Sequence, residues 1–252
     1  MPPAAGHKTT IDPGLAARVA ASLALLRQAA RAYGRLVYAS SLGAEAMVLI
    51  DLIWTHVPEI DIVSIDTGRL PEETLTLLER LERRYQRRVR LYYPDAQAVQ
   101  TYVREHGVNG FYNSLGERLS CCHIRKVEPF RRAVAGYAAW VTGVRREQSP
   151  QRAQEQPIAR DEQTGLQKIS PLLDWSGQDV WTYIGAHRLD YSPLHDRGYS
   201  SIGCAPCTRA VESGAEPRAG RWWWEDPDSR ECGLHPRRRL AGAMERLGEL
   251  AG

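Results

Sequence analysis

The spacing of apolar and polar positions changes period repeatedly along the first part of the chain. Residues 14–33 are apolar at helical spacing, and Asp12, Pro13 and Gly34 occupy cap positions, which predicts a helix. Buried strands are predicted at 36–39, 60–66, 89–92 and 138–142, and helices at 44–54, 71–85 and 96–106. The helix at 71–85 is expected to bury Leu75, Leu78, Leu81 and Tyr85. This alternation predicts an α/β fold, a parallel sheet with helices on both faces.

The rest of the chain is less regular. Residues 149–167 are polar and predict a mobile loop, and 168–173 predict an edge strand. Ser176 and Asp179 have capping-box spacing, which predicts a helix from there to residue 186. From Tyr191 to His235 the chain is rich in Gly, Pro, Cys, Arg and Trp with little periodicity, so we expect an irregular segment organised around a site. Residues 237–250 again have helical spacing.

Composition narrows the class of protein. A chain of 252 residues with 43% hydrophobic content suits one large α/β domain or two small ones. No run approaches the roughly 18 apolar residues of a membrane helix, and the first ten residues lack the apolar core of a signal peptide, so we expect a cytoplasmic protein without a membrane partner. The net charge of +3 gives no excess typical of a nucleic-acid-binding protein. Only three of the 33 basic residues are lysines, an arginine bias interpreted as codon usage, so Lys126 inside a motif stands out.

The predicted strands end in loops that are candidate binding elements: SSLGAE (40–45), DTGRL (66–70) and TGVRREQS (142–149). Ligands of parallel α/β sheets bind beyond the carboxyl ends of the strands. Ser40, Ser41 and Gly43 offer hydroxyl and backbone N–H groups at the start of a helix, an arrangement that suits an anion. The loop lacks the Gly-Lys-Ser/Thr of a nucleotide-binding P-loop. Taken alone, it is better interpreted as a turn, because many such loops contain Ser and Gly for turn geometry only.

Five cysteines in a reducing compartment disfavour a disulfide framework. Cys121, Cys122, Cys204 and Cys207 form two tight pairs, and four thiolates hold either zinc or a four-iron cluster. Neighbouring side chains normally point apart, which favours a cluster with separate iron corners over a single zinc ion.

Cys232 follows a segment with Arg218, Arg221 and the run Trp222–Trp224. Nearby cations lower the pKa of a thiol and attract an anionic electrophile, so Cys232 is a candidate nucleophile, with an inert packed thiol as the alternative. The tryptophan run is interpreted as a packing anchor.

The segments SSLGAE, IDTGRLPEET, CCHIRKVEPF, TGVRREQS, GYSSIGCAPCTR, GRWWWED and ECGLH follow one another along the chain. From about Leu36 to His235 the sequence resembles assimilatory adenylyl-sulfate reductases, the iron–sulfur branch of the APS/PAPS reductase family. The resemblance implies a Rossmann-like fold of the adenine nucleotide α-hydrolase (PP-loop) type. It implies a single domain at 12–235 with a catalytic tail at 208–235, after a disordered tail at 1–11 and before a helical extension at 236–252.

The resemblance also implies site roles. Cys232 would attack the sulfur of adenosine 5′-phosphosulfate (APS), forming an S-sulfocysteine and releasing AMP, and thioredoxin would then release sulfite. Cys121, Cys122, Cys204 and Cys207 would ligate one [4Fe–4S] cluster. The phosphosulfate would be held by Ser40, Ser41, Gly43, Lys126, Arg218, Arg221, His235 and one or both of Arg145 and Arg146. Asp66 and Thr67 would meet adenine and ribose, and Cys232 is expected to swing between substrate and reductant.

Three alternatives stay open. In the first alternative, the enzyme reduces PAPS, or both APS and PAPS. In the second the chain is a PP-loop tRNA-thiolating enzyme, against which the slight charge excess and the ECGLH tail argue. In the third it is a binding module stabilised by zinc on the same four cysteines. A homo-oligomer is compatible with the extension after His235.

Overall fold

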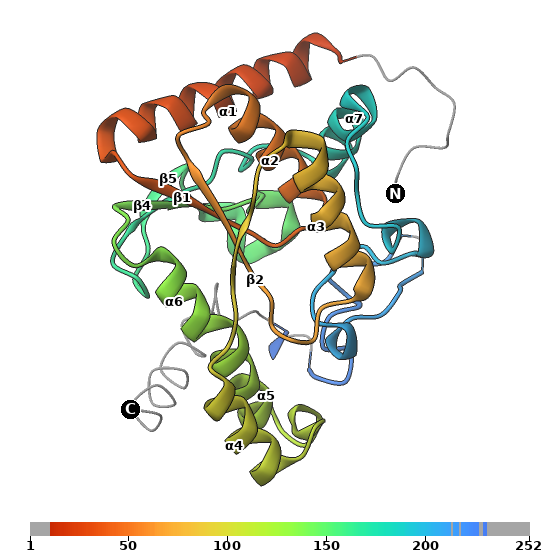
Figure 1. Ribbon diagram of the computed structural model, residues 1–252. Coiled ribbons are helices and arrows are strands. Elements are labelled where there is room, and N and C mark those ends of the chain that lie inside the picture. Colours follow the sequence, from red (N-terminus) through yellow and green to blue (C-terminus); the bar gives the residue numbers. More distant parts are fainter. Residues whose placement is uncertain (1–10, 213, 217, 227–228, 231–252) are drawn as a thin grey trace.

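The computed structural model describes residues 11–212, 214–216, 218–226 and 229–230, and every structural statement below refers to these residues (Figure 1). Two predicted site residues, Cys232 and His235, lie outside them. The predicted extension at 236–252 and all but residue 11 of the predicted N-terminal tail also lie outside.

The sheet confirms the predicted α/β architecture. Its strands are β1 (Leu36–Ser40), β2 (Asp61–Ile65), β3 (Arg90–Tyr92), β4 (Ala139–Val141), β5 (Ile158–Arg160) and β6 (Gln167–Ile169), in the order β3-β2-β1-β4-β6-β5. All neighbouring pairs are parallel except β5 and β6.

The prediction for 149–173 was wrong in two respects. The polar segment 149–167 contains the strand β5, and β6, expected at the edge, lies between β4 and β5. The hairpin is closed by a backbone hydrogen bond from Asp161 N to Leu166 O (2.8 Å), and Ile169 is fully buried.

The helices are α1 (Pro13–Tyr33), α2 (Ala44–His56), α3 (Glu72–Tyr85), α4 (Ala96–His106), α5 (Leu115–Cys122), α6 (Glu128–Val134) and α7 (Gly177–His187). A π-helical turn, His123–Val127, joins α5 to α6, and 3₁₀ turns lie at Gly110–Tyr112, Arg146–Gln148, Pro150–Gln154, His195–Arg197 and Ala205–Cys207. The predicted caps are confirmed: Leu15 N donates to Asp12 Oδ1 (2.8 Å), and Ser176 forms a reciprocal capping box with Asp179.

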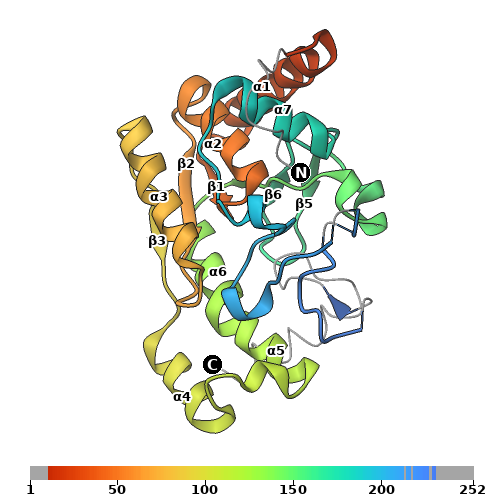
Figure 2. The same ribbon diagram turned by 90° about the vertical axis from the view of Figure 1, so that its right-hand side faces the viewer.

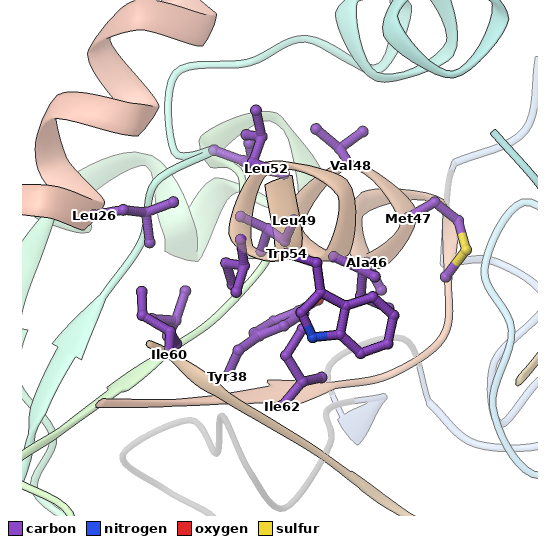
Figure 3. Packing of buried hydrophobic residues seen from close by; sticks show 14 of the residues in the cluster. Leu26, Tyr38, Ala46, Met47, Val48, Leu49, Leu52, Trp54, Ile60 and Ile62 are labelled. Carbon is purple, nitrogen blue, oxygen red and sulfur yellow. The ribbon is translucent and has the colours of Figure 1, made fainter. Parts of the chain in front are cut away.

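Helices cover both faces of the sheet. Residues of α1, α2, α3 and α7 share the largest apolar cluster, in which α2 is buried along most of its length against Leu26, Tyr38, Ile60 and Ile62 (Figure 3). On the other face, α6 packs Phe130 and Val134 against Val63 and Trp140. The predicted buried face of α3 needs one correction, because Leu75 is 40% exposed, whereas Thr74 and Leu77 are buried.

The path of the chain opens a crevice at one edge of the sheet. From β1 the chain moves outward through β2 to β3, then returns to β4 on the opposite side of β1. Loops after β1 and β4 therefore diverge at the carboxyl ends of the strands, the usual position of a ligand site in such sheets. In the view of Figure 2, α4 and α5 extend away from the sheet at the lower end of the molecule.

Among the described helices, none is both long and apolar enough to cross a membrane.

Candidate active site

One pocket lies at the carboxyl ends of β1, β2 and β4. Its walls include residues from all three predicted loops: Ser40, Ser41, Gly43, Thr67, Thr142, Gly143 and Arg145. The topology brings these loops together although more than 100 residues separate the first from the last. The prediction that the loops meet at one site is confirmed.

The loop after β1 is shaped to leave backbone N–H groups available. Leu42 adopts a left-handed conformation (φ 56°), and its N–H donates to Ser40 Oγ (3.2 Å). Ser64 Oγ in turn donates to Ser40 O (2.9 Å), which ties the loop to β2. Helix α2 follows Gly43 with no side-chain cap in the described part of the chain. The helix N-terminus facing this pocket therefore suits an anion.

The arginine loop after β4 is already balanced by carboxylates. Arg145, which is buried, donates from Nε to Glu45 Oε1 (2.9 Å) and from Nη1 to Glu147 Oε2 (3.0 Å). Arg146 points elsewhere, because its Nε donates to Asp174 Oδ1 (2.7 Å), and it does not line the pocket that the described residues form. One or both of these arginines were expected to hold the substrate. In the structure Arg145 fastens α2 to this loop, and Arg146 fastens the loop to Asp174.

The loop after β2 divides its two predicted residues. Asp66 Oδ1 accepts a hydrogen bond from Gly68 N (2.9 Å), and within the described residues Asp66 is not part of the pocket wall. Thr67 does line the pocket, and its Oγ1 lies 3.2 Å from Cys204 Sγ. Thr67 thus joins the strand end to the cysteines, while Asp66 shapes the turn.

The four cysteines of the two pairs reach this pocket from two elements. Cys121 and Cys122 end α5, and the π-helical turn that follows carries Arg125 and Lys126 on the same wall. Cys204 and Cys207 flank a 3₁₀ turn held by a hydrogen bond from Ala205 N to Arg69 O (2.8 Å). The four side chains belong to one cluster with Tyr102, Phe111 and Trp222. The structure brings the predicted ligands together.

Burial disfavours ionisation of two of these thiols, Cys121 and Cys207. Burial raises the pKa of Cys207 to about 12, with Cys204 adding to the rise and Arg221 opposing it. Burial also raises the pKa of Cys121, which Arg125 opposes. Because metal ligands bind as thiolates, a cationic centre would supply the missing compensation.

The donors present are four cysteine thiols. Within the described residues, no group of three or more His, Cys, Asp and Glu side chains is arranged to hold one metal ion. A zinc site requires four donors around a single point, whereas a four-iron cluster offers each thiolate its own iron. By the chemistry of the donor set, four cysteine thiols close together are ligands that a four-iron cluster takes.

Trp222 supports the two predicted tail arginines. The indole is buried, with the guanidinium carbon of Arg221 4.6 Å and that of Arg218 5.8 Å from its ring centroid. Trp222 N donates to Cys207 O (3.2 Å), so the segment folds back on the cysteine turn. Both arginines line the pocket, and the interpretation of Trp222 as a packing anchor agrees with its burial.

Lys126 and His195 present contrasting polar groups to the pocket. Lys126 has neither a hydrogen bond nor an ion pair with any described residue, so its charge is available to a ligand. His195 Nδ1 lies 2.7 Å from Tyr199 O, and its buried Nε2 has no partner among the described residues. Burial lowers the pKa of His195, although the bond to Tyr199 opposes this, so the imidazole is neutral near pH 7.

Sequence reasoning missed several pocket residues: Arg69, Arg125, Arg152 and His195. The three arginines were hidden by the arginine-rich background of the chain. Arg152 also lies in the segment that was expected to be a loop. His195 had one usable signal, its position in the irregular segment after Tyr191.

Residues 35–210 match the phosphoadenosine phosphosulfate reductase domain. The chain belongs to this family. Over 223 residues it is 52% identical to the adenosine 5′-phosphosulfate reductase of Allochromatium vinosum, covering 88% of this chain and 87% of that protein.

Two solved structures have folds similar to this chain. The phosphoadenylyl-sulfate (PAPS) reductase of Candida auris, solved as a phosphate complex, superposes with a TM-score of 0.65 at 26% identity, covering 80% of this chain and 98% of that one. The FMN adenylyltransferase of Candida glabrata superposes with a TM-score of 0.58 at 14% identity, over 97% and 86%. The second likeness concerns the fold alone, and it agrees with the expected α/β architecture.

Proposed function

We propose that the chain is an adenosine 5′-phosphosulfate reductase, which converts APS to sulfite and AMP in the assimilation of sulfate. One observation carries this proposal: a single pocket combines a helix start suited to an anion, four cysteine side chains, the tail arginines Arg218 and Arg221, and Lys126, which has no ion pair among the described residues. The relative from Allochromatium vinosum bears the same activity in its name. The proposed domain spans 12–235, with the catalytic tail at 208–235.

The nucleophile in this proposal is the thiolate of Cys232. Its sulfur attacks the sulfate sulfur of APS, an S–S bond forms, and the S–O bond to AMP breaks with its electron pair leaving on the phosphate oxygen. A dithiol of the thioredoxin type then attacks Cys232 Sγ of the S-sulfocysteine. Sulfite leaves with the electron pair of the S–S bond, and the second thiol of the reductant resolves the mixed disulfide, so the dithiol supplies both electrons.

The pocket residues stabilise the charge that develops in this reaction. Ser40, Ser41 and the N–H groups after Gly43 hold the phosphate, and Lys126, Arg218, Arg221 and His235 neutralise the phosphosulfate and the leaving oxygen. Thr67 stands at the nucleotide. Arg145 is balanced by Glu45 and Glu147, so it orders the pocket wall and adds little net charge.

The [4Fe–4S] cluster in this proposal is bound by Cys121, Cys122, Cys204 and Cys207 and supplies structural and electrostatic support. The clustering of the four side chains supports it. A reducing compartment, the cytoplasm, suits this chemistry. The alternative substrate is PAPS, as in the Candida auris relative, and kcat/KM for APS and PAPS measured side by side distinguishes the two.

The direct assay is incubation of the iron-loaded protein with APS and reduced thioredoxin, without ATP. Sulfite and AMP are expected in equal amounts, and a lack of sulfite contradicts the proposal, as does a requirement for ATP and RNA. The protein is expected to be brown, to absorb near 400 nm and to hold about four irons per chain. A colourless protein with one zinc contradicts the cluster. Cys232→Ser is expected to lose turnover and to keep its iron.

A further inference from the structure

A buried ion pair joins the cysteine-bearing helix to the tail that precedes Cys232. The side chain of Arg118 on α5 has no exposed surface, and that of Glu225 is 8% exposed. Arg118 donates from Nε to Glu225 Oε1 (2.8 Å) and from Nη2 to Glu225 Oε2 (2.7 Å). Nη2 also donates to Ser229 O (2.8 Å). One guanidinium therefore holds the tail at a side chain and at a backbone carbonyl.

The same guanidinium contacts the rest of the site. Its carbon lies 4.8 Å from the ring centroid of Trp222, the indole that also carries Arg218 and Arg221. Burial alone would lower the pKa of Arg118, but hydrogen bonds and charge at Glu225 and Cys122 raise it, so Arg118 stays charged. Arg118 thus meets the cysteine helix, the tail carboxylate and the tail tryptophan.

The tail is also folded around Glu225 itself. Arg230 donates from Nε and from Nη2 to Glu225 O (2.9 and 2.8 Å) and from Nη2 to Trp223 O (3.2 Å). Ser229 is three positions before Cys232, and extended chain covers at most about 11 Å over three residues. A fixed Ser229 therefore limits how far the thiol of Cys232 travels between substrate and reductant.

We propose that Arg118 is a positioning residue of the sulfate-transfer step: through Glu225 and Ser229 it sets the point from which the Cys232 segment reaches the substrate. This inference rests on the proposed role of Cys232. Stability alone is a weak reason for such a pair, because two buried charges lose hydration that their attraction only partly restores. The geometry supports another role for this ion pair: it holds the tail in one position.

The chain offers a matched control on the neighbouring helix. Arg132 of α6 makes the same kind of bidentate pair with Glu128 (2.6 and 2.9 Å) and also donates to a carbonyl, Tyr93 O. That pair is exposed, at 47% and 39%, and lies on α6 within its own turn. Arg132→Lys removes a bidentate fork without touching the tail.

The test measures single-turnover AMP release from APS without reductant, in the iron-loaded protein. Arg118→Lys and Glu225→Gln are each expected to slow release at least tenfold, with AMP affinity and iron content within twofold of the unsubstituted protein. The double variant is expected to be no slower than the slower single variant, because both changes disrupt the same ion pair. Arg132→Lys is expected to stay within twofold.

A second readout follows the tail without catalysis. Alkylation of Cys232 by N-ethylmaleimide, read by mass spectrometry of its peptide, is expected to accelerate at least threefold in both variants in the absence of APS. Release and alkylation rates within twofold of the unsubstituted protein overturn the inference. If Arg118→Lys loses iron, Glu225→Gln, which keeps Arg118, decides by the same criteria. AMP release that persists in Cys232→Ser contradicts the proposed function instead, whatever the Arg118 variant does.

Discussion

Gly203 controls where the guanidinium of Arg221 lies. A Cβ at this position would stand 2.2 Å from Arg221 Nη2, 2.5 Å from Cζ and 2.8 Å from Nη1. Carbon atoms do not approach others that closely, so Gly203→Ala forces the guanidinium to retreat by about 1 Å or more. The obstructed atoms are the end of a flexible side chain, so we expect the free energy of unfolding to change by less than about 1 kcal/mol.

The cost is expected in catalysis. Arg221 lines the pocket, and its guanidinium lies 4.6 Å from the ring centroid of Trp222. Displacement is expected to remove the charge-assisted hydrogen bond that we propose Arg221 makes to the bound anion. Such a bond contributes about 1.5–3 kcal/mol, which corresponds to a loss of roughly 10- to 150-fold in kcat/KM. Steady-state sulfite formation across a range of APS concentrations measures it, with urea unfolding and iron content recorded on the same preparation.

Two controls separate this reasoning from general damage. Gly220→Ala places its Cβ 2.3 Å from the backbone oxygen of Arg209, which cannot retreat, so this variant is expected to lose stability, by about 2 kcal/mol. Adding Gly203→Ala to Arg221→Ala is expected to change kcat/KM less than twofold, because the obstructed group is already gone. The reasoning is refuted if Gly203→Ala has the activity of the unsubstituted protein, or if the two changes multiply.

Three further predictions concern charge, core and metal. Lys126→Gln is expected to lower kcat/KM by roughly 10²- to 10³-fold at unchanged iron content, since Lys126 is a pocket cation with no ion-pair partner in the described part of the chain. Activity within twofold would remove Lys126 from the site. Asp51→Asn is expected to lower the free energy of unfolding by about 1–3 kcal/mol in urea titrations without changing kcat, because Tyr85 and Tyr183 both donate to its carboxylate (2.6 and 2.7 Å). An unchanged unfolding midpoint would contradict this. Removing iron with a chelator is expected to lower the melting temperature by at least roughly 5 °C, because the cysteine pair on α5 and the pair at the Ala205–Cys207 turn lose the cluster that links them. An unchanged melting temperature would argue against a cluster there.

Local signals made much of the fold predictable. Asp12, Pro13 and Gly34 marked both ends of α1, and Ser176 with Asp179 marked the start of α7, because these signals act within one helical turn. Strand β5 was not predicted from the sequence, because Ile158–Arg160 is short and pairs, among the described strands, with β6 alone. The periodicity of the sequence does not reveal that contact. The helices within 115–134 were not predicted either, because a π-helical turn between them interrupts the helical periodicity of the sequence.

The site was predictable where its chemistry is rare in the sequence. Paired cysteines and a solitary lysine stood out, and the structure places them on one pocket. Arginines did not stand out among 30 of their kind. Sequence gave no means to separate Arg145, held by Glu45 and Glu147, from Arg118, which bridges to Glu225 more than 100 positions away.

We propose that Cys232 takes the sulfonate group from APS. The most direct measurement mixes the iron-loaded protein with APS in the absence of reductant, counts AMP released per chain, and maps the modified cysteine by mass spectrometry. We expect one AMP per chain, a sulfonate on the Cys232 peptide alone, and sulfite release when reduced thioredoxin is added. Continued AMP release without reductant, or a sulfonate on any other cysteine, would contradict it.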